Sequence, residues 1–206
     1  MPWHTYYLWS GLALLVIEFM HFLFQRKLKD PRTLLLYAMM ITAFLLCAGG
    51  ILITFKLNLR QANFPVTILA TNIVYLCQLI LPYFFFCLIH LHITPRFDRT
   101  MQLMLIPSGI CVCFVLSNPC TGLIGHPEAD GLWHVGSCYP YFIDLILIWY
   151  IFDLFYIIKK RKYLKKQYFP LSEIAILLIA GTFIQNILLR NLFVGFAAAL
   201  SVAVIH

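Results

Sequence analysis

Charged residues are scarce in this sequence: only 11% of its 206 residues are Asp, Glu, Lys or Arg, whereas 62% are hydrophobic. A soluble domain has about 25% charged and about 45–50% apolar residues. A surface so poor in charge does not suit water, so we expect lipid to surround much of the chain. The excess of basic over acidic residues falls in short clusters between apolar runs. This pattern indicates anionic lipid headgroups as partners, and no nucleic acid.

The sequence also lacks the motifs of several enzyme classes. It has no Walker loop, no Gly-x-Ser-x-Gly, no His-Glu-x-x-His and no Cys-x-x-Cys pair. We therefore predict that the chain itself is not an enzyme and needs no metal or cofactor. A membrane-embedded enzyme using His21, His90 or His92 is the least favoured hypothesis, because these residues match no known catalytic arrangement.

Long apolar runs, in contrast, are abundant. A membrane-spanning helix needs about 20 apolar residues. The sequence predicts an all-α fold: a polytopic integral membrane protein with a seven-helix transmembrane bundle as a single domain over residues 1–206. The predicted spans cover residues 6–24, 34–55, 66–93, 101–117, 141–158, 171–189 and 190–206.

The distribution of basic residues predicts the orientation. Most lysines and arginines lie in the connections after the first, third and fifth predicted spans, with the densest cluster at Lys159–Lys166, and none lies between Asn118 and Pro140. Basic residues favour the cytoplasmic side. We therefore expect a multi-pass protein of the cell (plasma) membrane, with the N-terminus outside, the C-terminus inside and anionic headgroups near Lys159–Lys166.

The segment from Asn118 to Pro140 is the longest polar connection and is expected outside. Cys120 and Cys138 lie in it, and an oxidising exterior would permit a disulfide between them. Its two histidines and two acidic residues match no strong metal-ligand spacing, so we predict no metal site. The segment serves either as a simple connection or as a lid over a ligand. The residues in question are His126, Glu128, Asp130 and His134.

Ionisable residues inside the predicted spans form the second group of candidates, because such residues are costly in lipid. Asp144 lies one turn into the fifth span and could line an outer pocket. Asp153 lies deeper, where we expect it to pair with Lys159 or Lys160, or with a residue of the sixth span. Gln185 belongs to the sixth span and either joins helices or lines a cavity.

Three stretches of the second half are similar to a known family. They are the glycine-rich loop ending in Trp133-His134-Val135-Gly136, the aromatic fifth span followed by basic residues from Lys159, and the segments Ala180–Gln185 and Phe196–Ser201. The chain resembles the seven-helix N-terminal sensor region of bacterial diguanylate cyclases of the GGDEF type and of some histidine kinases. His134 departs from the aromatic residue usual there.

The resemblance implies a membrane sensor module for an extracytoplasmic or membrane ligand. Such a module signals to a cytoplasmic output domain or partner protein, for cyclic-di-GMP synthesis or histidine kinase activity, which this chain does not contain. A homodimer is compatible with this role. The alternative is a small transporter or permease with a polar path through Glu18, Asn72, Gln78, Asp153 and Gln185. The predicted ligand-binding residues of the sensor are Asn118, Trp133, His134, Asp144 and Gln185.

Overall fold

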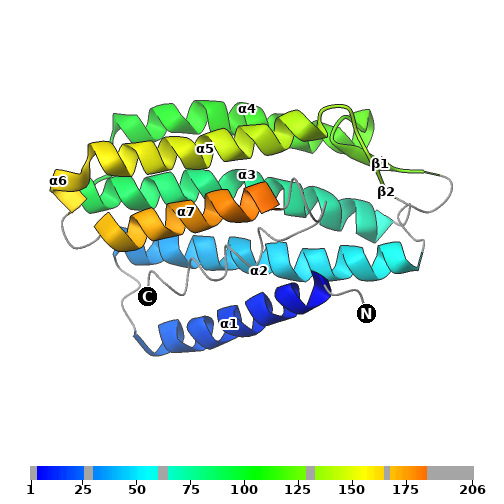
Figure 1. Cartoon of the computed structure of the whole chain (residues 1–206), viewed down its shortest axis with the longest axis horizontal. Helices are drawn as coiled ribbons and strands as arrows, with labels where there is room; N and C mark the ends of the chain where they lie inside the picture. The colour runs from blue at the N-terminus through cyan, green and yellow to red at the C-terminus, as the bar shows by residue number, and fades with distance from the viewer. Residues whose placement is uncertain (1–3, 26–29, 60–64, 129–132, 165–167, 185–206) are drawn as a thin grey trace.

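The computed structural model describes residues 4–25, 30–59, 65–128, 133–164 and 168–184. These residues form long helices that lie side by side, with a short hairpin at one end (Figure 1). The helices are α1 (His4–Gln25), α2 (Pro31–Asn58), α3 (Pro65–Ile93), α4 (Arg99–Thr121), α5 (Tyr139–Lys159), α6 (Arg161–Leu164) and α7 (Tyr168–Ile184), and the strands are β1 (Gly125–Pro127) and β2 (Trp133–Val135).

Four of these helices, α2, α3, α4 and α5, are long and apolar enough to cross a membrane. Two further helices contain shorter apolar stretches, Leu8–Met20 in α1 and Phe169–Ile184 in α7. The prediction of a mostly helical protein with several membrane-length helices is thus confirmed. The predicted seventh span, residues 190–206, lies outside the described residues.

Helix α4 has the apolar exposed surface that is expected of a helix in lipid. Only 17% of its most apolar stretch is buried inside the protein, although that stretch is as apolar as a membrane span. Its exposed side chains include Leu103, Leu105, Ile106, Ile110 and Leu116. A continuous apolar surface of this kind is unfavourable in water and favourable against lipid tails.

Helix α3 lies at the centre of the bundle. In its most apolar stretch 72% of the residues are buried, and it packs against α2, α4, α5 and α6. The contact with α2 is especially close at Gly49, where an added Cβ would come within 2.6 Å of Val74 Cγ2. Small residues permit such close approach between membrane helices. Because α3 touches most other helices, a change at either of its ends reaches much of the bundle.

Hydroxyl and amide side chains within the helices mostly bond to their own backbone. Thr42, Thr71, Ser108 and Thr182 each donate to the carbonyl four residues earlier, at 2.7–3.0 Å. In lipid every polar group needs a partner, and this local bond supplies one without a neighbouring helix. A polar side chain that bonds to another helix or to the hairpin therefore marks a specific contact between elements.

Prolines and caps set the ends of the helices. Pro31 and Pro65 begin α2 and α3, where a missing N–H costs little. Pro82 and Pro107 lie inside α3 and α4. Helix α4 runs to Thr121, four residues beyond the predicted end of the span, and stops where Gly122 adopts the left-handed conformation with φ 64°. That conformation favours glycine and ends the helix.

The hairpin is a short addition to the helical fold that the sequence did not predict. Strands β1 and β2 pair antiparallel, with His126 opposite His134. The segment is short and rich in glycine, so its pattern predicted a loop and concealed the pairing. The backbone N–H and C=O groups need partners where the chain crosses the end of the bundle, and the hairpin provides them.

Candidate functional site

Asn118 fastens the hairpin to the bundle. Its side chain is buried, and Oδ1 accepts hydrogen bonds from the backbone N–H groups of Ile124 (2.8 Å) and Gly125 (3.2 Å). Its Nδ2 donates to the Gly125 carbonyl and to Asn72 Oδ1, both at 3.1 Å. Two donors and two acceptor positions are all that an amide side chain offers. Asn118 therefore has no position left for a ligand, and it joins α4 to both the hairpin and α3.

Glycines allow the hairpin to lie close to its own backbone. A Cβ on Gly136 would overlap the carbonyl oxygens of Leu123 and Gly122, and one on Gly125 would overlap the Trp133 indole nitrogen. The backbone bonds Gly136 N to Ile124 O (2.9 Å) and Cys138 N to Leu123 O (2.8 Å) hold this arrangement. The glycine-punctuated sequence thus encodes a compact hairpin with the indole of Trp133 folded onto Gly125.

The outward face of the hairpin carries two histidines and a carboxylate. Glu128 lies between them, with Oε1 3.8 Å from His126 Nε2 and Oε2 3.4 Å from His134 Nε2. All three side chains are between 41% and 50% exposed, so they are accessible to a polar ligand. Within the described residues no group of three such side chains is arranged to hold a metal ion. Asp130 lies outside the described residues.

The structure brings together only some of the predicted ligand-binding residues. Asn118, Trp133 and His134 meet at the hairpin, whereas Asp144 is exposed on α5 and Gln185 lies outside the described residues. Two apolar hollows, of about 300 and 220 Å³, lie instead between α1 and α2 and between α4 and α5. Their linings are almost wholly apolar, which suits lipid tails better than a polar ligand.

The two loop cysteines are not joined in the structure. Cys120 is exposed near the end of α4, and Cys138 is half-buried just before α5, and both are free thiols. The disulfide that an oxidising exterior would permit stays a prediction. The hydrogen bonds of Asn118 and the glycine contacts hold the hairpin without it.

The opposite end of α3 carries a second polar cluster. His90 is 5% exposed, and its Nε2 lies 2.9 Å from Asp98 Oδ2 while its Nδ1 lies 2.9 Å from the Tyr156 hydroxyl. Asp98 Oδ1 also caps α4 by accepting from the backbone N–H groups of Thr100 (2.9 Å) and Met101 (3.2 Å). We call His90, Asp98 and Tyr156 the basal triad. It joins α3, the start of α4 and the last turns of α5.

Hydrogen bonds within the basal triad and at the start of α4 lower the pKa of Asp98. Partial desolvation raises the pKa of Asp98, but the hydrogen bonds from His90, Met101 and Thr100 outweigh it and hold that pKa below its usual range. An ionised Asp98 only accepts, so His90 Nε2–H donates to it, while His90 Nδ1 and the Tyr156 hydroxyl share the second hydrogen bond. Because the folded pKa is lowered, this stabilisation is present at neutral pH and is lost as the pH falls through that value.

Stacked rings hold the basal triad in place. The Tyr156 ring lies nearly parallel to His90 (19°) and to Phe152 (14°), and Phe86 stacks against His90 with ring centroids 6.0 Å apart. The sequence alone did not reveal the partners of His90. Asp98 lies only 8 residues from His90 in the sequence, whereas Tyr156 lies 66 residues further along the chain.

Asp153 is the third feature, in the interior between the two ends. Its side chain is fully buried, and neither carboxylate oxygen has a hydrogen-bond partner among the described residues. The expected pairs with Lys159 or Lys160 are therefore not formed. Tyr150, one turn earlier on α5, is also fully buried with its hydroxyl unpartnered in the described part of the chain.

Comparisons with known proteins place the chain in no family. No protein-family model matches it, and no curated protein or solved structure is significantly similar to it. The resemblance to bacterial sensor regions therefore stays a prediction. What the structure establishes is the class: a mostly helical protein with several apolar helices of membrane-spanning length, whose central helix ends in a polar cluster on each side.

Proposed function

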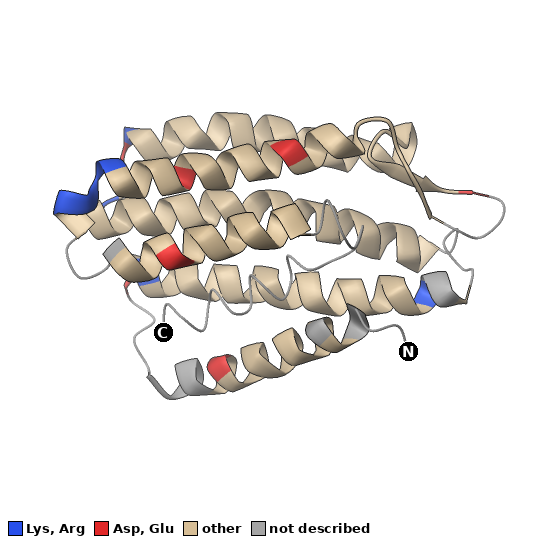
Figure 2. Ribbon diagram, viewed as in Figure 1, with Lys and Arg blue, Asp and Glu red and all other residues tan. Residues whose placement is uncertain are grey.

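We propose that this protein is a multi-pass receptor of the plasma membrane that detects a ligand at the hairpin and signals to its cytoplasmic face. The proposal includes seven spans, with the N-terminus and the hairpin outside. Its support is the sorting of charge, because lysines and arginines gather at the end of the bundle where α5 ends, and fewer lie at the opposite end with the hairpin (Figure 2). Basic residues favour the cytoplasmic side. The basic residues at that end include Arg96, Arg99, Lys159, Lys160, Arg161 and Lys162.

The observation that carries the receptor role is the fastening of α3 at both ends. At the outer end Asn72 of α3 bonds to Asn118 of α4, which also holds the hairpin. At the inner end His90 of α3 bonds to Asp98, which caps the same helix α4. A ligand that shifts the hairpin would pull on α4 at Asn118. Because α3 and α4 are joined again below, the shift would strain the basal triad.

The helices that meet at the inner end of α3 can adopt two discrete arrangements. The basal triad is either bonded, with α4 capped and α5 held to α3 through Tyr156, or broken, with these helices free to move. A ligand can shift such an equilibrium by its differential affinity for the two states. The basic segment from Lys159 follows α5 directly and would present the change to a cytoplasmic output domain or partner protein.

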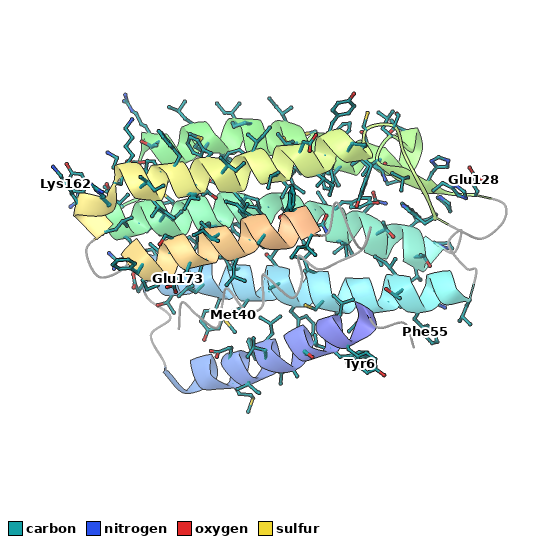
Figure 3. The ribbon with its side chains drawn as sticks, in the orientation of Figure 1. Tyr6, Met40, Phe55, Glu128, Lys162 and Glu173 are labelled. Carbon is teal, nitrogen blue, oxygen red and sulfur yellow. The ribbon has the colours of Figure 1, made fainter. Side chains whose placement is uncertain are left out.

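The ligand would contact the exposed side chains of the hairpin. All hydrogen-bonding positions of Asn118 are occupied by protein groups. The side chains that the hairpin exposes to a ligand are His126, Glu128 and His134. The three side chains combine one carboxylate with two imidazoles, which suits a small polar or ionic ligand. Figure 3 shows Glu128 at the end of the molecule far from Lys162, so recognition and output would be separated by the length of the bundle.

A thermal-shift screen of the purified protein in lipid nanodiscs tests the receptor. The panel contains amino acids, organic acids, sugars and divalent cations, and the variants are His134→Ala and, as a matched control, Val135→Ala at the exposed neighbouring position. A ligand at a hundred times its Kd stabilises the folded state by about 2.7 kcal/mol. We expect at least one compound to raise the Tm of the wild type and of Val135→Ala but not of His134→Ala.

The same compound should also change the basal triad. Hydrogen exchange of the Met101 amide, which Asp98 caps, is expected to change on ligand addition in the wild type only. A panel without any shift, or equal shifts in both variants, would contradict ligand recognition at the hairpin. A shift in Tm without any change in exchange at Met101 would show that the protein binds the compound but would contradict signalling to the basal triad.

A small transporter is the second candidate, because a buried acid without a partner is typical of ion and proton pathways. Gln78 and Asp153 are buried, and Gln78 Oε1 and both Asp153 oxygens lack partners among the described residues. Uptake assays in liposomes separate the two hypotheses. Transport of a solute that is lost in Asp153→Asn would favour the transporter, and binding without uptake would favour the receptor.

A further inference from the structure

Asp153 lies in surroundings that disfavour a charged carboxylate. It is fully buried, its oxygens have no hydrogen-bond donor among the described residues, and α5 is apolar on both sides of it. Leaving an ionised carboxylate without a partner in such a place costs several kcal/mol. Binding a proton removes that cost, so the neutral carboxylic acid is the form that this environment stabilises.

In the described part of the chain, the elements packed against α5 offer Asp153 no counter-charge. Cys87 of α3 and Tyr150 of α5 are close enough to interact with it electrostatically, and Tyr83 lies next to Cys87. The buried side chains of α7 are Leu171, Ile174, Ala175, Leu178 and Thr182, and the Thr182 hydroxyl bonds to Leu178 O. Glu173 of α7 and the basic residues Arg161 and Lys162 of α6 are exposed.

A chain of hydrogen-bonding groups leads from Asp153 toward the basic end of the bundle. Tyr156 lies one helical turn after Asp153, and residues three apart lie on the same face. Side chains on a helix lean toward its N-terminus, and the Tyr156 ring stacks on Phe152, the residue before Asp153. No direct hydrogen bond joins Asp153 to Tyr156, so a route between the two groups requires one bridging water. From Tyr156 the 2.9 Å bonds continue to His90 and Asp98.

We propose that Asp153 is a proton-binding site inside the membrane and that it exchanges its proton with water at the basic end of the bundle through Tyr156, His90 and Asp98. Asp98 is the exit of this route, because its side chain is 36% exposed whereas that of His90 is 5% exposed. The proposal goes beyond the receptor role and does not depend on what binds the hairpin.

The proton count balances along the route. On release, the Asp153 proton moves to the bridging water, a proton of that water moves to the Tyr156 oxygen, and the Tyr156 hydroxyl proton moves to His90 Nδ1, which forms an imidazolium beside ionised Asp98. The proton on His90 Nε2 then passes to Asp98 Oδ2 and from there to water. One proton has left Asp153, Tyr156 and Asp98 keep their proton numbers, and His90 ends as the other neutral tautomer. Loading is the reverse and restores the first tautomer without a ring flip.

Infrared spectroscopy of the protein in lipid tests the proton on Asp153. A protonated carboxylic acid has a carbonyl stretch that a carboxylate lacks. We expect this band at neutral pH in the wild type, its loss in Asp153→Asn, and no change in the matched control Asp144→Asn, an exposed acid on the same helix. If Asp153→Asn does not fold, isotope-labelled aspartate in the wild type assigns the band to aspartic acid.

Exchange of the acid proton for deuterium tests the route. On transfer from water to heavy water the carbonyl band shifts, and the rate of the shift reports how quickly the proton leaves. Tyr156→Phe removes the hydroxyl but keeps the stacked ring, and we expect it to slow this exchange on the order of tenfold or more. Tyr163→Phe, an exposed tyrosine just beyond α5, is the control and should exchange like the wild type.

Two results would overturn the proposal. A wild type with no carboxylic acid band, or a band that persists in Asp153→Asn, would show that Asp153 does not hold a proton. Equal exchange rates in Tyr156→Phe and the wild type would show that the proton leaves by another path. Neither result depends on ligand binding at the hairpin, so failure here and failure of the receptor role are distinguishable.

Discussion

Replacing Gly136 by alanine is expected to destabilise the hairpin strongly. The new Cβ would overlap the carbonyl oxygens of Leu123 and Gly122, which are backbone atoms and cannot rotate away. Overpacking a tight site costs about 1–3 kcal/mol or more, and here we expect about 3 kcal/mol because two backbone segments must separate. The measurement is the Tm in nanodiscs together with protease cleavage of the hairpin.

Gly109→Ala is the matched control for this substitution. Gly109 lies within α4, and its Cβ would meet nothing within 4 Å. Alanine in a helix interior is more stable than glycine by about 1 kcal/mol. A Gly136→Ala protein with wild-type Tm and wild-type protease resistance would contradict the close packing of the hairpin on the end of α4.

Replacing Asn118 by alanine is expected to have the second large effect. The change removes four hydrogen bonds and leaves the N–H groups of Ile124 and Gly125 and the side chain of Asn72 without their partner. A buried polar group that loses its partner costs about 1–3 kcal/mol. Since the hairpin can open partly and hydrate, we expect the free energy of unfolding to fall by about 3–5 kcal/mol, which is at the upper end for single substitutions. Proteolytic cleavage of residues 122–138 should become at least tenfold faster.

Thr121→Ala supplies the control at the end of the same helix. The exposed Thr121 hydroxyl bonds only to Ser117 O among the contacts described, at 3.1 Å. Its loss should change the Tm little, since surface substitutions lie within about 0.5 kcal/mol. Equal effects of Asn118→Ala and Thr121→Ala would contradict the fastening role of Asn118 and, with it, the mechanical link between the hairpin and α3.

The sequence predicted the helices well because lipid imposes a strong and local requirement. Every spanning backbone must bond within itself, so a long apolar run can only be a helix. Pro31 and Pro65 mark helix starts for the same local reason, a proline's missing N–H. The end of α4 was predicted four residues early, because the polar residues before Gly122 suggested a loop while the left-handed glycine sets the true end.

The candidate sites were harder to predict, since their contacts are not local. Asn118 was identified as important, but as a ligand contact, because nothing in the sequence reveals that its four bonds go to Asn72 and the hairpin. The Tyr156 hydroxyl bonds to His90 across a long sequence separation. Asp153 was expected to find a nearby lysine, but helix geometry turns it inward while Lys159 stays exposed at the surface.

Cysteine accessibility in intact cells tests the central claim, that the hairpin and the basal triad lie on opposite sides of a membrane. In a variant with all seven natural cysteines replaced, single cysteines are introduced at Glu128 or at Lys162, which lie at opposite ends of the bundle (Figure 3). We expect a membrane-impermeant maleimide to label position 128 in intact cells and position 162 only after permeabilisation. Labelling of position 162 from outside, or of both positions equally, would contradict the account.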